Sequence, residues 1–229
     1  MREKMGKEIS LVRIYDMLFS RFGDRDWWPG QTRDEVIIGA ILAQNVAWSN
    51  VETAIGKLRE RGILNLKGVL EAPAEELAPL IRSTRYYNQK AAKLKAFARF
   101  FQNEFDLDHG RMFSRNLREL RERMLAIKGL GPETVDSILL YAGDLPVFVI
   151  DSYTRRLLGR LGLQPEKDSY AGWQDHITSR LPGNVRIFKD FHAQIVCLCK
   201  DICKPVPRCD KCPLGEICAF RLFDLDKMP

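Results

Sequence analysis

An aspartate and a glycine-flanked turn carry the first chemical signal in this sequence. Asp151 follows the apolar run 147–150 and precedes Ser152, where a helix is expected to begin. Upstream, residues 127–132 read Ile-Lys-Gly-Leu-Gly-Pro between two helical stretches. Backbone N–H groups at a helix N-terminus, with the positive end of the helix dipole behind them, form a site for a phosphate oxygen. This layout can hold a nucleic-acid backbone beside a catalytic acid.

Each part of this layout also has a purely structural interpretation. Gly129 and Gly131 are expected to take positive φ and to let a partner approach the backbone, and Pro132 suits the first turn of a helix. A Gly-x-Gly turn nevertheless joins helices in many all-α proteins, and Asp is a favoured N-cap. The combination of turn and Asp151 is less common than either part.

The cysteines form the second candidate site. All six lie between Cys197 and Cys218, and such clustering in a cytosolic chain indicates metal before disulfides. Four of them, separated by five, two and five residues, can hold a four-iron cluster or one zinc ion: Cys203, Cys209, Cys212 and Cys218. The long spacings favour a [4Fe-4S] cluster over zinc or reduced thiols. Cys197 and Cys199 are expected to be buried on the preceding helix.

Amide and aromatic side chains form the third candidate group. A predicted buried helix delivers Gln44 and Asn45 at its C-terminal end. Such a pair has the donors and acceptors to fill the gap left in a duplex by a displaced base, or to satisfy backbone groups at the helix end. Trp27 and Trp28 stand in a loop, so either one packs in the core and the other is open to a ligand, or both anchor the loop.

The elements that must position these groups are all expected to be helices. Apolar residues recur at helical spacing, and no stretch shows the convincing alternation of a strand. Helices are expected over 9–22, from 34 through 43, over 51–61, 74–81 and 89–105, from 114 to 125, from 132, from 151 to 161, through 173 to 181 and over 184–200.

The sequence also predicts some caps and one solvated helix face. Ser49 or Asn50 is expected to cap the helix 51–61, and Ser114 the helix that ends at Leu125. The basic residues expected on a solvated face of the helix 89–105 are Lys90, Lys93, Lys95 and Arg99.

Composition and charge bound the class of protein. The 229 residues are 45% hydrophobic and 29% charged, which is ordinary for a soluble globular protein of one large or two small domains. The net charge of +6 is a mild indication of a polyanionic partner, and Lys204, Arg208 and Lys211 beside the cysteines suit phosphate contacts. Without an apolar run of ~18 residues or a signal-peptide core, we expect a cytosolic protein.

Taken together, these motifs resemble a known family. The hairpin with Asp151 and the four-cysteine loop resembles the helix-hairpin-helix DNA glycosylases of the endonuclease III superfamily, over nearly the whole chain. The segments similar to the endonuclease III-related branch that includes 3-methyladenine DNA glycosylase III are 27–29, 39–45, Trp48, 86–91 and 127–134.

The resemblance implies an all-α fold of two helical domains, with the DNA and the lesion pocket between them. The first would be a six-helix barrel-type domain at 30–145 that contains the hairpin, at about 114–142. The second would combine 1–29 with 146–229 and carry the cysteine loop 203–218.

The resemblance also implies roles for individual residues. Asp151 corresponds to the catalytic aspartate, Gln44 to the residue that fills the duplex near the flipped base, and Trp28 and Trp48 to aromatic pocket positions. Trp27, Asn45 and Glu133 complete the expected set around the base. The residues expected against the DNA backbone are Lys128, Gly129, Leu130, Gly131 and Thr134.

Two departures from the family pattern matter. Bifunctional members carry a lysine two residues after the second hairpin glycine, and it forms a Schiff base with the sugar. This sequence has Glu133 there, and a carboxylate cannot form an imine, so β-lyase chemistry of that type should be absent unless Lys128 substitutes. The first cysteine spacing is one residue shorter than in endonuclease III.

The expected function is therefore that of a monofunctional DNA glycosylase in base excision repair. It would act as a monomer on damaged double-stranded DNA, in the cytoplasm at the nucleoid. An N-alkylated base of the 3-methyladenine type is the expected substrate, because it carries positive charge, leaves readily and stacks on indole. The alternatives are a glycosylase for oxidised or deaminated bases and a non-catalytic DNA-binding module.

Overall fold

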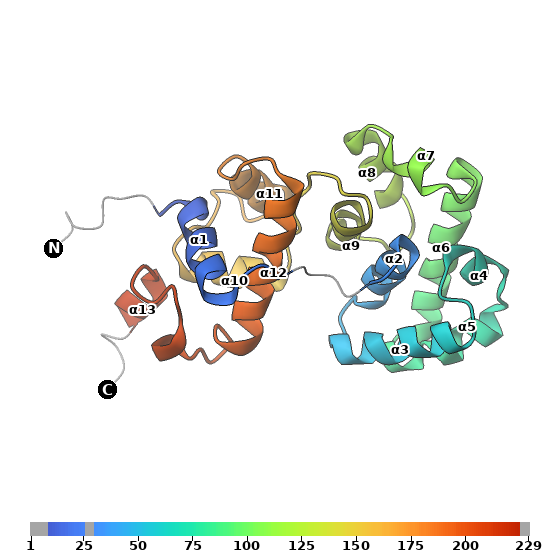
Figure 1. Cartoon of the computed structure of the whole chain (residues 1–229), viewed down its shortest axis with the longest axis horizontal. Coiled ribbons are helices and arrows are strands. Elements are labelled where there is room, and N and C mark those ends of the chain that lie inside the picture. The colour runs from blue at the N-terminus through green and yellow to red at the C-terminus, as the bar shows by residue number, and fades with distance from the viewer. Residues whose placement is uncertain (1–8, 26–29, 225–229) are drawn as a thin grey trace. The chain divides into compact units, whose positions relative to one another are not determined.

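The computed structural model describes residues 9–25 and 30–224, and every regular element in these residues is helical (Figure 1). The expected all-α fold is thus confirmed. The elements are α1 (Leu11–Phe22), α2 (Arg33–Leu42), α3 (Trp48–Glu60), α4 (Leu66–Glu71), α5 (Ala74–Leu80), η2 (Arg82–Thr84), α6 (Tyr87–Phe105), α7 (His109–Phe113), α8 (Leu117–Leu125), α9 (Pro132–Ser137), the π-helical η3 (Ile138–Ala142), α10 (Ser152–Arg160), α11 (Tyr170–Thr178), α12 (Val185–Asp201), η4 (Cys209–Lys211) and α13 (Ala219–Asp224). Among the described helices, none is both long and apolar enough to cross a membrane.

The chain divides into two compact units. Unit 1 comprises Met1–Trp27 and Pro146–Pro229, and unit 2 comprises Trp28–Leu145. Unit 1 therefore combines both ends of the sequence, whereas unit 2 is one continuous segment.

In unit 2, α2 is buried almost all round, as its apolar composition predicts. Every residue from Glu35 to Leu42 is buried, and the helix packs against α3, α6, α9 and η3. Its N-cap Thr32 accepts a hydrogen bond from the Glu35 N–H at 3.1 Å, and acidic residues in the first turn complement the helix dipole. Arg59 of α3 pairs with the buried Glu35 carboxylate at 2.8 Å. The buried charge of Glu35 is thus compensated by an ion pair.

Two predicted caps are wrong. The helix α3 begins at Trp48 after the N-cap Ala47, which has no capping side chain, so Ser49 and Asn50 already lie inside its first turn. Ser114 ends α7 instead of starting α8. The N-cap of α8 is Asn116, whose side chain accepts from the N–H groups of two residues in the first turn and so satisfies both.

Of the basic residues of α6 that were predicted to lie on a solvated face, Arg99 is exposed, whereas the three lysines are buried or half-buried. Lys90 is 2% exposed, and its ammonium donates to the carbonyls of Leu42 at 2.8 Å and of Thr84. Lys95 similarly donates to the carbonyls of Leu70 and Ala72. Since the last carbonyls of a helix lack intrahelical partners, these lysines cap the C-terminal ends of α2, η2 and α4. Burial, together with the nearby Lys93, lowers the pKa of Lys90 to about 8.

Unit 1 is organised around α12. Phe148 of the apolar run packs edge-on against Phe188 at 5.6 Å between ring centroids and contacts Phe191 at 6.0 Å. Tyr15 of α1 reaches the same Phe191 at 5.8 Å. The apolar run 147–150 is buried throughout, so the residues that lead to Asp151 are fixed in the core of unit 1.

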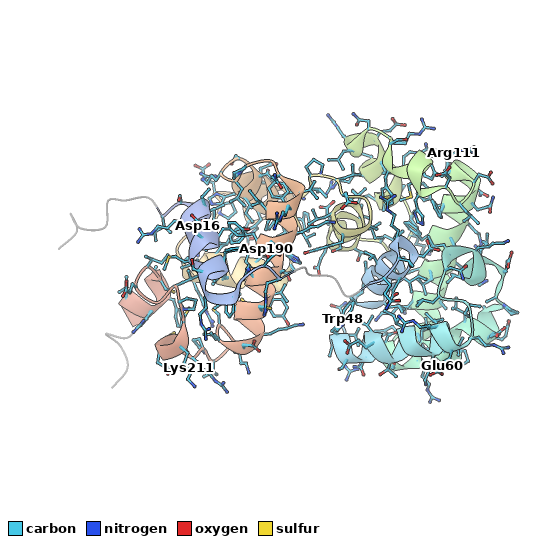
Figure 2. All side chains as sticks on the ribbon, viewed as in Figure 1. Asp16, Trp48, Glu60, Arg111, Asp190 and Lys211 are labelled. Carbon is cyan, nitrogen blue, oxygen red and sulfur yellow. The ribbon has the colours of Figure 1, made fainter. Side chains whose placement is uncertain are left out.

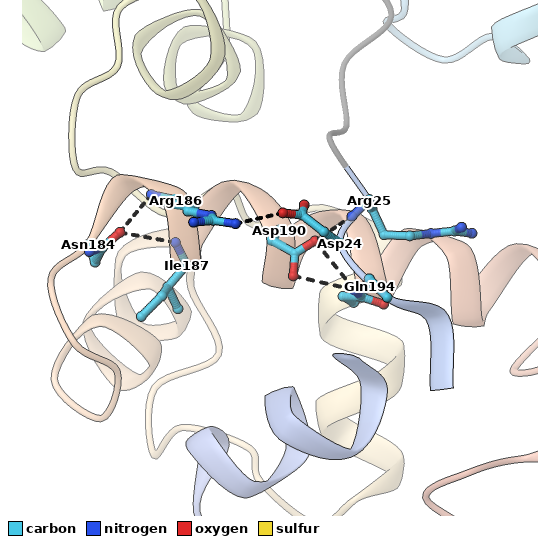
Figure 3. A network of polar contacts seen from close by, with 8 residues as sticks. Asp24, Arg25, Asn184, Arg186, Ile187, Asp190 and Gln194 are labelled. Carbon is cyan, nitrogen blue, oxygen red and sulfur yellow. Dashed lines mark hydrogen bonds and ion pairs between the residues drawn. The ribbon is translucent and has the colours of Figure 1, made fainter. Parts of the chain in front are cut away.

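A polar network also fastens the segment after α1 to α12 (Figure 3). Asp190 accepts a hydrogen bond from the Arg25 N–H at 3.0 Å, and the Gln194 amide donates to the Gly23 carbonyl at 2.6 Å. Arg186 pairs with Asp24 at 2.8 Å. Burial and a hydrogen bond to Asp190 raise the pKa of Tyr15 to about 12. Helix α1 is therefore attached to α12 through both aromatic and polar contacts.

Candidate functional site

The turn between α8 and α9 lies in unit 2 and has the backbone geometry of a tight helical hairpin. Gly129 takes φ +91°, a conformation that side chains other than glycine rarely adopt. Gly131 has φ −90° in extended backbone, so the positive φ expected for both glycines is found only at Gly129. Gly131 is instead the N-cap of α9, and a Cβ built there would meet nothing within 4 Å. Pro132 occupies the first helical turn, as predicted.

The outer side of this turn is polar and open. Lys128, Gly129 and Gly131 are exposed, and their backbone N–H groups donate to no residue that the structure describes. Leu130 and Thr134 point inward and are 5% and 7% exposed. The turn therefore places several amide donors at the surface of unit 2 while its apolar residue anchors it.

A buried ion pair holds the two helices of the hairpin together. Arg121 of α8 donates to both carboxylate oxygens of Asp136 on α9, at 2.6 and 3.0 Å, and the Asp136 side chain is fully buried. A bidentate pair of this kind fixes orientation as well as distance. The buried ion pair thus fixes the two helices on either side of the turn, and with them the geometry of the turn.

Gln44 follows the end of α2 and reaches the hairpin. Its amide nitrogen donates to Thr134 Oγ1 at 2.9 Å and to the Gly129 carbonyl at 3.4 Å. Its amide oxygen accepts a hydrogen bond from the ammonium of Lys93 on α6. In this structure the Gln44 amide is bound within the protein, which corresponds to the structural interpretation of this residue.

Of the other residues predicted around the base, Asn45 and Trp48 lie close to Gln44 in sequence. Asn45 is exposed with φ 53°. Trp48, labelled in Figure 2, is the first residue of α3 and is half-buried. Its indole N–H donates to Glu52 at 3.0 Å. Trp27 and Trp28 lie outside the described residues.

Asp151 lies in unit 1 and is the N-cap of α10. Its Oδ1 accepts a hydrogen bond from the Thr154 N–H at 2.7 Å, and its Oδ2 lies 3.5 Å from Nε2 of His192 on α12. The side chain is 12% exposed. The carboxylate therefore caps the helix through Oδ1, and its Oδ2 contacts His192.

These partners determine the ionisation of Asp151. Burial raises the pKa of the carboxyl, but the His192 contact and the hydrogen bonds from Thr154 outweigh it, so the pKa of Asp151 lies below its ordinary value. The group is an anion at neutral pH. A carboxylate kept ionised in a nearly dry place can stabilise positive charge that develops beside it.

The predicted metal ligands come together in unit 1. All four cysteines, Cys203, Cys209, Cys212 and Cys218, line one cavity together with residues of α10 and of the C-terminal loop. Within residues 9–25 and 30–224, no three His, Cys, Asp or Glu side chains converge as ligands of a single metal ion. As predicted, Cys197 and Cys199 are buried on α12.

Arginines of α10 supply positive charge to the cysteine loop. Arg160 donates to Cys203 Sγ at 3.2 Å, to the Lys204 carbonyl at 2.7 Å and to the Pro205 carbonyl at 2.9 Å. A hydrogen bond from Cys199 and the nearby arginines lower the pKa of Cys203, against the effect of burial. Burial raises the pKa of Cys209 and that of Cys212. The observation that fits an iron-sulfur cluster is therefore the set of four sulfur donors around one cavity, with arginines beside it.

The position of the family's Schiff-base lysine is occupied by a carboxylate at the surface. Glu133 is exposed in the first turn of α9, next to the open turn. Lys128, the other candidate amine, lies on the exposed side of the turn.

Lys93, Arg160 and His192 each contact a predicted site residue from another helix, and none of these contacts was predicted from the sequence. Helical periodicity gives no information on such pairs. The one available signal was for His192, a polar residue inside the apolar stretch of α12.

The comparisons with known proteins agree on one family. The model of the HhH-GPD superfamily of base excision DNA repair proteins matches residues 38–182. A Methanocaldococcus jannaschii protein, provisionally named a DNA repair glycosylase, is 39% identical over 216 residues, which cover 94% of this chain and 98% of the relative.

Solved structures are similar to this chain over most of its length. The H. pylori 3-methyladenine DNA glycosylase bound to 1,N6-ethenoadenine has a TM-score of 0.75 at 25% identity, and the match covers 84% of this chain and 98% of that one. A trapped endonuclease III–DNA covalent intermediate has a TM-score of 0.80 at 20% identity, covering 93% and 97%, which shows the shared fold. With the family model matched over more than half of its residues, this chain belongs to the HhH-GPD superfamily of base excision repair DNA glycosylases.

Proposed function

We propose that this DNA glycosylase is monofunctional and hydrolyses the N-glycosidic bond of an alkylated, 3-methyladenine-type base that is flipped from duplex DNA. The observation that carries the proposal is the state of Asp151: an ionised, nearly buried carboxylate fixed by Thr154 and His192. An anion held in this way can stabilise an oxocarbenium-like transition state. It can also orient or deprotonate the attacking water.

The DNA-backbone contacts are assigned to the hairpin. The exposed amides of Lys128, Gly129 and Gly131 would donate to phosphate oxygens, with the α9 dipole behind them. Leu130 and Thr134 would fix the turn from inside. Such contacts position the duplex without reading its sequence.

The absence of lyase activity is proposed from Glu133. An exposed carboxylate at this position cannot attack the sugar to form an imine. Base release would therefore leave an intact strand with an abasic site.

The substrate class is proposed from the likeness to the H. pylori 3-methyladenine enzyme and from the aromatic positions Trp28 and Trp48. A cationic alkylated base stacks favourably on indole and departs without strong acid catalysis. Trp27, Gln44, Asn45 and Glu133 complete the proposed surroundings of the base. We also propose that the protein acts as a monomer in the cytoplasm, on nucleoid DNA.

A [4Fe-4S] cluster is the proposed cofactor, held by Cys203, Cys209, Cys212 and Cys218, which share one cavity. When bound, it would crosslink the loop and supply no step of the hydrolysis. Arg160 would hold the loop to α10. Lys204, Arg208 and Lys211 would then present positive charge to phosphates; Figure 2 shows Lys211 on this loop.

Duplex oligonucleotides that each contain one defined lesion test the proposal. Wild-type protein should release 3-methyladenine, and the strand should break only after heating in alkali. Borohydride should trap no covalent protein–DNA adduct with the wild type. If strands with uracil or thymine glycol are processed while 3-methyladenine is retained, the proposed substrate is wrong.

A matched variant tests the lyase assignment. Glu133→Lys places a primary amine where bifunctional relatives have one, so a borohydride-trapped adduct is expected with this variant alone. An adduct of equal yield with wild-type protein would contradict monofunctional chemistry and would direct attention to Lys128.

A further inference from the structure

Lys93 contacts the Gln44 side chain, and the proposed function gives Lys93 no role. Lys93 lies on α6, half-buried, and donates to the amide oxygen of Gln44. It was predicted to be a solvated charge. Instead it is bound to the side chain proposed to enter the duplex.

With Lys93 in place, both ends of the Gln44 amide are engaged. The oxygen is held by Lys93, and the nitrogen donates to Thr134 Oγ1 and to the Gly129 carbonyl. An ammonium offers donors only, so it distinguishes the amide oxygen from the amide nitrogen. The amide therefore has one orientation, with its nitrogen toward the hairpin.

The hairpin glycine makes room for this arrangement. A Cβ at Gly129 would lie 2.7 Å from Lys93 Cε and 3.0 Å from Cγ, so the lysine stem lies directly against the bare Cα of the turn. The positive φ of Gly129 and its lack of a side chain thus serve one purpose on the protein side: they let Lys93 pass the turn and reach Gln44.

Helix α6 also fixes the backbone from which Gln44 projects. Lys90, one turn before Lys93, caps the Leu42 carbonyl at the end of α2. One lysine thus fixes the main chain two residues before Gln44, and the other fixes its side chain. Both act from the same helix, which packs against α2.

We infer that Lys93 is a positioning residue: it holds Gln44 against the hairpin, so that the side chain proposed to fill the duplex is preset relative to the turn proposed to grip the strand. The inference deepens and rests on the proposed function. Holding one side chain in advance removes an ordering cost that corresponds to about two- to tenfold in an equilibrium constant.

The variant Lys93→Met tests this inference, because methionine keeps the length and apolar stem but has no donor. Lys93→Arg keeps a charged donor and should rescue. Lys67→Met, at an exposed lysine of the same unit with a side chain 70% exposed, controls for the loss of one charge.

Base flipping is the first measurement, through the fluorescence of 2-aminopurine placed beside an uncleavable analogue of the damaged nucleotide at saturating protein. Lys93→Met should reduce the flipped fraction about two- to tenfold, with thermal unfolding unchanged. Lys93→Arg should lie close to wild type, and Lys67→Met should equal wild type. Flipping by Lys93→Met that equals or exceeds wild type overturns the inference, as does a loss explained entirely by unfolding.

Side-chain amide NMR of the free protein is the second measurement and needs no DNA. The Gln44 amide should be ordered in wild type and mobile in Lys93→Met. If the amide is ordered through Lys93 but no lesion is excised, the proposed function fails and the contact stands. If lesions are excised and the Gln44 amide is equally mobile in both proteins, the positioning role fails alone.

Discussion

The N-termini of α9 and α10 differ in how they are capped. The first turn of α9 begins after Gly131, has no side-chain cap, and lies beside exposed backbone amides. The first turn of α10 begins after Asp151, whose carboxylate satisfies the Thr154 amide and is nearly buried. The first end has no capping side chain, and the acid in its first turn, Glu133, is exposed, whereas the second end is capped by its own nearly buried anion. The same element can thus offer a binding surface or stabilise a reactive charge, depending on its cap.

The largest effect is expected from Asp151→Asn. Asparagine is as good an N-cap as aspartate, so α10 should keep its start while the negative charge is lost. Base excision should fall by about 10²–10⁴-fold, with DNA binding retained. Single-turnover excision and binding to an abasic-site duplex measure the two effects. Full excision activity in this variant would mean that Asp151 only caps the helix. No excision by either protein, with DNA binding retained, would mean that the protein is a binding module.

The open end of α9 depends on the ion pair beneath it, and Arg121→Met should break that support. The variant removes the bidentate partner of the fully buried Asp136 carboxylate. A loss of about 3–5 kcal/mol in the free energy of unfolding is expected, with faster hydrogen exchange in α9.

Arg118→Met provides the control on the same helix, since this arginine is 89% exposed and pairs at the surface with Glu122. It should change stability by less than about 1 kcal/mol. Equal effects of the two variants in urea unfolding would show that the buried pair does not set the hairpin.

The closed end of α10 can be probed through pH. His192→Phe removes a contact that lowers the pKa of Asp151, so burial is less opposed and the pKa should rise. A depressed carboxyl pKa contributes stability above the unfolded-state value and loses it as pH falls through the folded value. In the variant this loss, and the acid limb of excision, should both move to higher pH. The shift is measured from the pH profiles of excision and of unfolding. If the acid limb of excision stays at the same pH, His192 is not the group that lowers the pKa of Asp151.

The smallest effects are expected from substitutions of the two hairpin glycines. Gly129 tests the backbone conformation of the turn, and Gly131 tests the access of DNA to it. Gly129→Ala should destabilise unit 2 by about 1–2 kcal/mol because of its φ of +91°, and its methyl group would also meet Lys93 Cε at 2.7 Å. Gly131→Ala has a φ of −90° and no neighbour within 4 Å, so it should cost less than about 1 kcal/mol. Its methyl group would instead obstruct the open turn and weaken DNA binding. If Gly131→Ala binds DNA as well as wild type, the turn is not the contact surface.

The sequence predicts what depends on local chemistry. The burial of α2, Pro132 in the first turn and the gathering of the cysteines around one cavity all follow from patterns within short segments. Asp151 as an N-cap was foreseen as well, although its two partners were not.

What the sequence misses are pairs between distant segments. Lys90 and Lys93 look like surface charges, because no local pattern shows that helix ends and the Gln44 amide will lie within reach of their ammonium groups. The His192 contact to Asp151 likewise exists only once α12 packs against α10. Caps between closely spaced helices fail for a related reason: Ser114 and Asn116 are both acceptable caps, and tertiary packing decides between them.

Unit 1 is made of two chain segments that are separated by unit 2, and this order affects how the protein folds during synthesis. Residues 28–145 emerge from the ribosome as one uninterrupted stretch and can complete their core early. Helix α1, which precedes unit 2 in the chain, must wait for α12 before Tyr15 and Arg25 meet Phe191 and Asp190. Helix α1 is therefore enclosed only after all of unit 2 has been made, and the acidic centre at residue 151 is complete only once His192 of α12 has been synthesised.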